Sequence, residues 1–249
     1  MQKYLKQFPL TAYISRSGLK PLKQIIGDCV FIIAEAGVNH NGDLNIAIQL
    51  VETAARVGAN AIKFQTFTAD SLVCKEAPKA DYQKQTTNRG ESQYAMIRRL
   101  ELDENAHRTL IRYCKEKEID FLSSPFDLAS IELLATLDVP LFKIPSGEIT
   151  NYPYLAKIGA YGRPVILSTG MSNMNEVKHA VEVLYKSGLT DSQIALLHCN
   201  TEYPTPMEDV NLNAMITLKN AFPGIAVGYS DHTEGIEIPI AAVAMGATI

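Results

Sequence analysis

The feature that most constrains this chain is a regular alternation of short apolar runs with helix-like segments. Seven runs each pass directly from apolar residues into polar ones: FIIAEAG (31–37), AIKFQTF (61–67), FLSSPFD (121–127), LFKIPSGE (141–148), PVILSTGM (164–171), IALLHCN (194–200) and IAVGYSDHT (225–233). Near-continuous apolar runs are typical of parallel strands covered on both faces. Alternation with helices favours an α/β fold, a (β/α)8 TIM barrel, whose polar strand ends would meet at one mouth.

The segments between these runs carry helix signals. Asp43 can cap a helix over 44–57, and Gly58 stands where a C-terminal glycine belongs. Asp103 can cap a second helix that extends to about 118. Further helices are expected near 91–100, 128–137, 153–160, 174–187, 211–221 and 235–245. No GxGxxG or GxxxxGK[ST] motif follows any strand, which disfavours a nucleotide-binding sheet.

The domain boundaries follow from where this alternation starts and stops. Residues 1–27 show no period and are expected to be an N-terminal extension or a cap on the barrel floor. Residues 28–249 form the predicted catalytic barrel, with a long polar excursion at 68–91 that is functional or mobile. Ala247, Thr248 and Ile249 are expected to begin an eighth strand, so the barrel is predicted to be cut within it.

Composition excludes several classes of protein. A net charge of −4 argues against a nucleic-acid or membrane-surface partner, and no apolar stretch approaches the roughly 18 residues of a spanning helix. The four cysteines are scattered without a CxxC pair, which is typical of reduced thiols in a cytosolic enzyme. The N-terminal segment lacks the apolar core of a secretory signal. We therefore expect a cytoplasmic enzyme.

Polar residues at the strand ends are the candidates for chemistry. Lys63 and Lys143 lie inside apolar strands, where an unpaired ammonium is costly. They could form structural ion pairs with Glu35 or Glu148, or they could bind an anion or form a Schiff base. Two lysines and several serines would suit a phosphate plus a carboxylate. The full convergent set is Glu35, Asn39, His40, Lys63, Gln65, Ser123, Ser124, Lys143, Ser146, Glu148, Ser168, Thr169, His198, Asn200, Tyr203, Ser230, Asp231 and His232.

The histidines have weaker signals. His232 could ligate a metal, but metal sites usually need two or three protein ligands, and a lone histidine is more often a hydrogen-bonding residue. His198 lies within a strand and is expected to be buried and satisfied. His107 and His179 fall on predicted helices and are expected to be solvated.

The motifs together resemble the sialic acid synthase family, the phosphoenolpyruvate-dependent N-acylneuraminate synthases. The matching segments run in order from residue 28 to 249: AEAGVNHNG (34–42), KFQT (63–66), ESQYAMIRRLEL (91–102), SSPFD (123–127), KIPSGE (143–148), PVILSTGM (164–171), ALLHCNTEYPTP (195–206) and GYSDHT (228–233). The resemblance implies a TIM barrel followed by an antifreeze-like domain, in a homodimer. It implies condensation of phosphoenolpyruvate with N-acetylmannosamine or a related acylamino sugar, giving a sialic-type acid and phosphate.

The resemblance also assigns residues. Glu35, Lys63, Lys143 and His232 are expected to be catalytic, and His232 to hold a divalent metal, Mn²⁺ or Mg²⁺. The expected substrate-binding residues are Gln65, Ser124, Ser146, Glu148, Ser168, Asn200, Thr201, Tyr203 and Ser230. A second metal histidine is expected just beyond Ile249, and the antifreeze-like domain lies outside the chain, so activity of these 249 residues alone is not expected. Three alternatives stay open: a legionaminic or pseudaminic acid synthase, a class I pyruvate aldolase, and a non-catalytic fragment.

Overall fold

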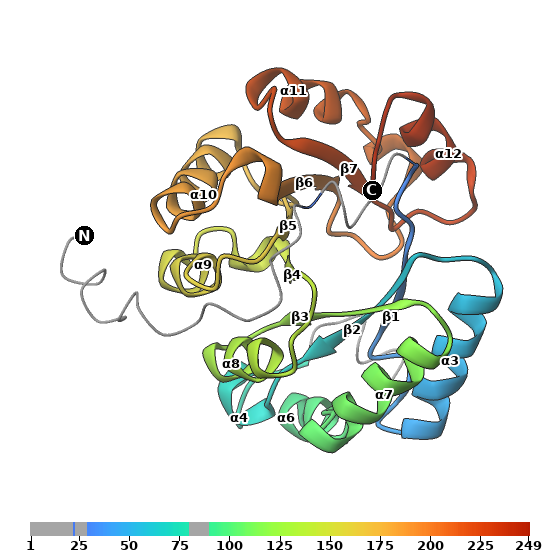
Figure 1. Ribbon diagram of the computed structural model, residues 1–249. Helices are drawn as coiled ribbons and strands as arrows, with labels where there is room; N and C mark the ends of the chain where they lie inside the picture. Colours follow the sequence, from blue (N-terminus) through green and yellow to red (C-terminus); the bar gives the residue numbers. More distant parts are fainter. Residues whose placement is uncertain (1–21, 23–28, 80–89) are drawn as a thin grey trace. The chain divides into compact units, whose positions relative to one another are not determined.

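The computed structural model describes residues 22, 29–79 and 90–249 (Figure 1). The described residues divide into two compact units, Ile33–Val139 and Pro140–Ile249, the second of which also takes in the described residues before Ile33. We call them the N-terminal and the C-terminal unit and describe each by itself. The predicted extension at 1–27 lies outside the described residues apart from Leu22, as does the central part of the excursion at 68–91.

The N-terminal unit is a parallel three-stranded sheet with helices packed on it. Strand β2 lies between β1 and β3, and α3, α7 and α8 contact the sheet (Figure 1). Three aspartates begin these helices as N-caps: Asp43 accepts from the Asn45 N–H, Asp103 from Ala106 and Asp127 from Ser130. The elements are β1 (Ile33–Gly37), α3 (Leu44–Arg56), β2 (Ala61–Thr66), α4 (Ala69–Leu72), α6 (Gln93–Arg98), α7 (Glu104–Glu116), β3 (Asp120–Pro125) and α8 (Leu128–Thr136).

The C-terminal unit is a parallel four-stranded sheet in the order β4-β5-β6-β7. Helices α11 and α12 contact its last strands, and α9 packs against α10. The elements are β4 (Phe142–Ile144), η1 (Ser146–Glu148), α9 (Tyr152–Gly159), β5 (Val165–Ser168), α10 (Met174–Lys186), η2 (Asp191–Gln193), β6 (Ile194–Cys199), η3 (Met207–Asp209), α11 (Asn213–Ala221), β7 (Ala226–Ser230) and α12 (Glu237–Ala244). All seven predicted strands and the predicted helices are present, with ends shifted by one or two residues in most cases.

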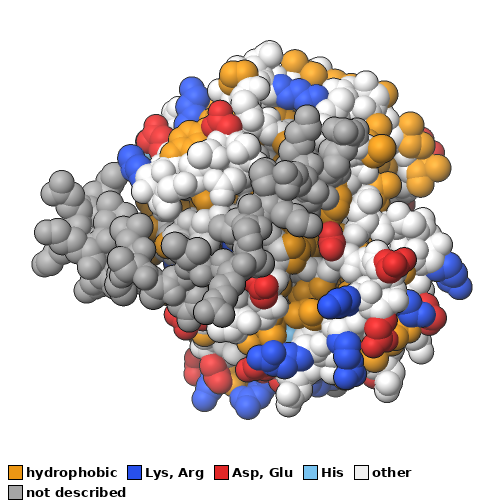
Figure 2. All heavy atoms as spheres, viewed as in Figure 1, with side chains coloured by type: hydrophobic (Ala, Val, Ile, Leu, Met, Phe, Trp, Pro, Cys, Tyr) orange, Lys and Arg blue, Asp and Glu red, His pale blue; other side chains and the backbone are white. Residues whose placement is uncertain are grey.

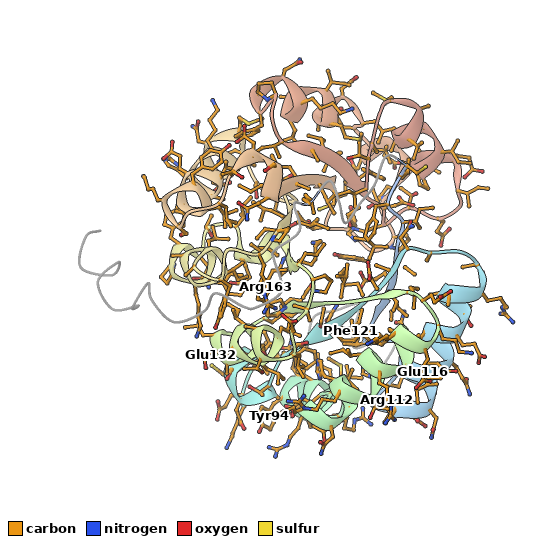
Figure 3. All side chains as sticks on the ribbon, viewed as in Figure 1. Tyr94, Arg112, Glu116, Phe121, Glu132 and Arg163 are labelled. Atoms are coloured by element: carbon orange, nitrogen blue, oxygen red, sulfur yellow. The ribbon has the colours of Figure 1, made fainter. Side chains whose placement is uncertain are left out.

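The strand register decides which side chains share a face. In the N-terminal unit Gln65 lies opposite Ser124, and Phe64 lies opposite Ser123. Because successive residues of a strand point to opposite faces, Gln65 and Ser124 share one face and Phe64 and Ser123 the other. Phe64 stacks on Phe121 (labelled in Figure 3) with ring centroids 5.6 Å apart, so this second face holds the aromatic core of the unit.

The same alternation sorts the C-terminal sheet. Lys143 lies opposite Ile166, and Cys199 lies opposite Ser230. His198 lies opposite Tyr229, and their ring centroids are 5.7 Å apart on the other face of the sheet. Alternate side chains of each strand therefore lie on opposite faces of the sheet. One face carries the polar residues at the strand ends, and the other carries residues that pack against the helices.

The predicted eighth strand is present only as the backbone bonds of its first residues. Ala247 to Ile249 form no strand element. The N–H of Thr248 nevertheless donates to the carbonyl of Val227 at 3.1 Å, and the N–H of Tyr229 donates to Ile249 at 2.9 Å. The N–H of Phe31 donates to the carbonyl of Thr248 at 2.9 Å. The segment thus runs beside β7, as a following strand would.

The surface mixes both signs of charge. Figure 2 shows acidic and basic side chains interspersed, with apolar side chains gathered near α12, where Ile236 and Ile240 are 67% and 61% exposed. Within the described ranges, no helix has the length and apolar character needed to cross a bilayer.

Candidate functional site

The strongest candidate cluster lies where β4 and β5 end. Lys143 is buried, and its ammonium donates to the Ser168 hydroxyl oxygen at 2.6 Å and to the Ile144 carbonyl at 3.0 Å. Because Ser168 accepts from Lys143, its own hydroxyl hydrogen is free to point to another acceptor. A buried ammonium with an adjacent hydroxyl is an arrangement that suits an anion.

Ser146 continues this cluster toward the β5–α10 connection. Its hydroxyl oxygen accepts from the Gly170 N–H at 2.9 Å and lies 3.3 Å from the Cys199 sulfur. A Cβ added at Gly170 would stand 2.7 Å from the Thr201 methyl carbon, 2.9 Å from the Ser146 oxygen and 3.0 Å from the Cys199 sulfur. Only glycine fits there, so Ser146, Thr201 and Cys199 meet around a bare backbone. Gly170 and Cys199 were not among the predicted site residues, and neither carries a side-chain signal that would have identified it.

His232 is held by the loop that follows β6. Its Nδ1 lies 2.6 Å from the carbonyl oxygen of Asn200, its own carbonyl accepts from the Thr205 N–H at 2.8 Å, and the Tyr203 ring lies 4.3 Å from its ring centroid. A carbonyl can only accept, so Nδ1 carries the hydrogen. In neutral imidazole Nε2 then keeps its lone pair, which is the form that ligates a metal.

The remaining predicted residues of the C-terminal unit fall into two groups. Ser230 ends β7 opposite Cys199, so it lies on the face of the cluster. The side chains of Asn200 and Glu148 bind the chain itself: Asn200 donates to the Asp209 carbonyl at 2.9 Å, and Glu148 accepts from Asn151 at 2.7 Å. These bonds hold the loops after β4 and β6. They use the amide nitrogen of Asn200 and one carboxylate oxygen of Glu148, so the amide oxygen of Asn200 and the other carboxylate oxygen of Glu148 can accept from a ligand.

The N-terminal unit carries a second polar cluster, at the ends of β1 and β2. The Lys63 ammonium lies 2.5 Å from the Glu35 carboxylate, and Lys63 is largely buried while Glu35 is half exposed. Gly37, with φ +50°, lies close to the side chains of Glu35 and Gln65. A Cβ at this position would stand 3.1 Å from a Glu35 oxygen and 3.6 Å from the Gln65 amide nitrogen. The ion pair considered from the sequence is therefore present, and Gln65 belongs to the same cluster.

Ser123 and Ser124 separate at the end of β3. Ser124 lies opposite Gln65 and shares its face. Ser123 points the other way, where its hydroxyl lies 2.6 Å from that of Thr66. The expectation that Ser123 joins the convergent set is wrong, because the alternation along a strand sends neighbouring side chains to opposite faces.

The prediction that His107 is solvated is also wrong. Its side chain is fully buried on the inner face of α7, where Nε2 lies 2.8 Å from the Thr66 hydroxyl and Nδ1 lies 2.8 Å from the Asp103 carbonyl. Figure 3 labels Arg112 and Glu116, which lie on the exposed side of the same helix. Burial lowers the pKa of His107. His179, by contrast, is exposed as predicted.

Two further histidines, His40 and His198, each have a buried ring nitrogen without a hydrogen-bond partner among the described residues. In both rings this nitrogen is Nε2. Burial lowers the pKa of both. For His198 we expected a buried ring with its hydrogen bonds made. Its Nε2 is buried, but this nitrogen makes no hydrogen bond to the described residues. Burial also raises the pKa of the neighbouring Tyr229 to about 12, with the Asp231 carboxylate acting in the same direction.

The described residues contain no group of three or more His, Cys, Asp and Glu side chains arranged to hold a metal. His232, with its free Nε2, fits the role of a single ligand. Asp231 beside it accepts from the N–H and the hydroxyl of Thr233, so its carboxylate is used to shape its own turn.

Comparison with known proteins identifies the fold class and then the family. A crystal structure of N-acetylneuraminic acid (sialic acid) synthetase from Leptospira borgpetersenii, in complex with citrate, matches with a TM-score of 0.76 and 37% identity, over 89% of this chain and 72% of that one. The fold is accordingly α/β, of the TIM-barrel class. The NeuB family model matches residues 50–249. This chain belongs to the NeuB family.

Two curated relatives are more similar in sequence. The N,N'-diacetyllegionaminic acid synthase of Campylobacter jejuni is 56% identical over 218 residues, which are 88% of this chain and 65% of that protein. The synthase of the same name from Legionella pneumophila is 48% identical over 236 residues, 94% of this chain and 65% of that protein. The chain therefore spans just under two thirds of the length of these relatives.

Proposed function

We propose that the protein condenses phosphoenolpyruvate with an acylamino sugar aldehyde and water, giving a nonulosonic acid and inorganic phosphate. The observation that carries the proposal is the buried Lys143 ammonium donating to Ser168 at a strand end, in a chain of the NeuB family. A carboxylate and a phosphate on a small molecule require such cations and hydroxyls in a partly enclosed site.

The proposed roles follow from the contacts in each unit. Lys143 and Ser168 hold the enol phosphate, together with Ser146, whose oxygen already accepts from Gly170 and which can donate its hydrogen to a ligand. In the N-terminal unit, Lys63 and Ser124 are the proposed substrate contacts, with Gln65 on their face. The further predicted contacts are Glu148, Asn200, Thr201, Tyr203 and Ser230.

The proposed reaction balances without an oxidant or reductant. The enol carbon C3 of phosphoenolpyruvate attacks the aldehyde carbon, and a C–C bond forms as the aldehyde oxygen takes up a proton. Water adds to C2, and the bond between C2 and the phosphate oxygen then breaks to release phosphate. The residues above contribute by holding the two reactants in contact, which lowers the entropic cost of reaction. Glu35, half exposed beside Lys63, would orient the sugar or move its proton.

A divalent cation, Mn²⁺ or Mg²⁺, is part of the proposal. His232 fits it as one ligand, because Nδ1 bonds the Asn200 carbonyl and Nε2 is left with a lone pair. When bound, such an ion polarises a carbonyl oxygen as a Lewis acid.

We further propose a sugar carrying two acetamido groups as the acceptor. The two relatives that make N,N'-diacetyllegionaminic acid are 56% and 48% identical to this chain, whereas the sialic acid synthetase is 37% identical. A nonulosonic acid has nine carbons and phosphoenolpyruvate supplies three, so the acceptor is a six-carbon aldose. N-acetylmannosamine, with one acetamido group, is the competing acceptor.

We also propose that the protein acts in the cytoplasm, as a homodimer, without nucleic acid or membrane. Four free cysteines and a net charge of −4 support the reducing compartment and the absence of a polyanionic partner. Light scattering of the full protein would measure its oligomeric state.

The experiment that tests the function measures phosphate release by the full protein. Phosphoenolpyruvate and Mn²⁺ are supplied with N-acetylmannosamine or with the diacetamido aldose, and the second sugar should have the higher kcat/KM. EDTA should abolish release, and added Mn²⁺ should restore it. Absence of phosphate with every sugar, or undiminished turnover in EDTA, would contradict the proposal.

Two other results would indicate the alternative functions. A pyruvate adduct trapped by borohydride would indicate a class I aldolase. The ion pair of Lys63 with Glu35 disfavours Lys63 in this role, because a Schiff base needs a neutral amine. Phosphoenolpyruvate binding in calorimetry without turnover would indicate a binding protein.

A further inference from the structure

A buried chain of hydrogen bonds joins α7 to the ends of β2 and β3. The Asp103 carbonyl oxygen lies 2.8 Å from His107 Nδ1, and His107 Nε2 lies 2.8 Å from the Thr66 hydroxyl. The Thr66 hydroxyl in turn lies 2.6 Å from that of Ser123. All three side chains are at most 3% exposed, so water does not compete for these bonds.

The direction of every bond in this chain is determined. A carbonyl oxygen can only accept, so His107 carries a hydrogen on Nδ1. Burial favours the neutral ring, so Nε2 has a lone pair and accepts from the Thr66 O–H. The Thr66 hydroxyl donates its only hydrogen to His107, so its oxygen accepts from the Ser123 O–H. The order of donation is Ser123 to Thr66 to His107 to the Asp103 carbonyl.

This series of hydrogen bonds lies on one face of β2 and β3, and the N-terminal polar cluster lies on the opposite face of the same strands. Thr66 follows Gln65 directly in β2, and Ser123 precedes Ser124 directly in β3. Gln65 and Ser124 lie opposite each other in register. Adjacent residues of a strand point to opposite faces, so fixing Thr66 and Ser123 to α7 also fixes the backbone from which Gln65 and Ser124 project.

We propose that His107 is a positioning residue for substrate binding, acting through Thr66 and Ser123 to hold Gln65 and Ser124 in place. The role rests on the proposed function, since it concerns how phosphoenolpyruvate is held. His107 itself does not touch the reacting atoms. A helix histidine on the far side of the sheet thus controls the affinity of the site.

Substitutions that cut the chain test the proposal in the full protein. Thr66→Val keeps the shape and removes the hydroxyl, and His107→Leu removes the acceptor. Each should raise the KM for phosphoenolpyruvate about tenfold or more, which is the size of effect found when a metal ligand loses its outer hydrogen-bond partner, and leave the KM for the sugar within about threefold. Thr66→Ser keeps the hydroxyl, and His107→Gln keeps a polar group near the position of Nε2, so both should restore the KM for phosphoenolpyruvate.

The matched control is Thr109→Val, on the same helix, whose hydroxyl donates to the Asn105 carbonyl at 2.9 Å. It should leave both KM values unchanged. A folded His107→Leu protein with an unchanged KM for phosphoenolpyruvate would overturn the proposal. So would an equal rise in both KM values, because that pattern indicates general loss of structure.

A spectroscopic measurement tests this series of hydrogen bonds without substrate. In ¹⁵N-labelled protein, NMR distinguishes a ring with hydrogen on Nδ1 from the more common form with hydrogen on Nε2. His107 should show hydrogen on Nδ1, and Thr66→Val should shift its Nε2 resonance. Hydrogen on Nε2 would overturn the inference even if the enzyme is active. A protein with the expected His107 signal but no phosphate release would instead contradict the proposed function alone.

Discussion

Lys143 is the residue on which the proposed chemistry depends most. Its ammonium is buried, and it donates to the Ser168 hydroxyl and to the Ile144 carbonyl. A buried ammonium beside a hydroxyl supplies charge-assisted hydrogen bonds to an anionic ligand. The chemistry of this position therefore suits the carboxylate or the phosphate of the proposed substrate.

Replacing this lysine should separate activity from stability. Lys143→Met keeps the length of the side chain and removes the charge. We expect phosphate release to fall by about 100-fold or more, about 2.7 kcal/mol in transition-state free energy, because the charge that holds the anion is gone, while the melting temperature changes little.

Steady-state kinetics and thermal unfolding of the same samples make the measurement. Lys178→Met on α10, where the side chain is exposed, is the matched control and should change neither quantity. A melting temperature several degrees lower for Lys143→Met would show that the ammonium serves stability.

At the scale of elements, the connection from β5 to α10 is held by hydrogen bonds at both of its ends. Thr169 bonds the Leu197 carbonyl through its N–H and its hydroxyl, at 2.9 and 3.0 Å. Asn173 begins α10 with a capping box, in which Glu176 bonds back to the Asn173 N–H at 2.8 Å. Gly170 lies between these anchors, so the loop has little freedom to move away from its neighbours.

A methyl group at Gly170 should therefore damage the site. Gly170→Ala would place Cβ within 3.0 Å of Ser146, Thr201 and Cys199, and the backbone is held on both sides. We expect a loss of about 1–3 kcal/mol in unfolding free energy and a rise in the KM for phosphoenolpyruvate. Urea denaturation and phosphate-release kinetics measure the two effects.

Gly147→Ala is the control for this substitution, because a Cβ at Gly147 meets nothing within 4 Å. It should leave the unfolding free energy within about 0.5 kcal/mol of the parent. Equal effects at the two glycines would refute the packing argument.

On the scale of the whole molecule, three histidines make stability depend on pH. Burial lowers the pKa of His40, His107 and His198 below the ordinary 6.5. Between each folded-state pKa and 6.5 the unfolded chain binds more protons than the folded one. The unfolding free energy should therefore fall as the pH drops below about 6.5, by up to about 1.4 kcal/mol per pH unit for each histidine.

Urea denaturation at a series of pH values from 7.5 to about 5 measures this slope. His107→Gln should make it shallower, because one buried titrating group is gone. His179→Gln is the control, since that side chain is exposed on α10. An unchanged slope in His107→Gln would mean that His107 binds protons equally in both states.

Local patterns in the chain predicted the elements well. Asp43 and Asp103 cap the helices that their positions indicate, and Gly58 follows α3 with φ +82°. These signals act within one turn of helix, so they need no knowledge of the rest of the fold. Apolar runs likewise predicted the seven strands of the described residues, because a strand that is covered on both faces is apolar along most of its length.

The sequence by itself thus determined the order of the strands and helices. It also determined that each strand ends in polar residues. Tertiary structure decided which of those groups share a face and what lies behind them. Ser123 turned toward α7, and His107 proved to be buried against Thr66, 41 positions earlier in the chain. A single histidine on a helix has no local pattern that reveals its partners, since hydrogen bonds between distant segments depend on register and packing. Only the folded sheet brings α7 behind β2 and β3, and with it the residues proposed to position the site.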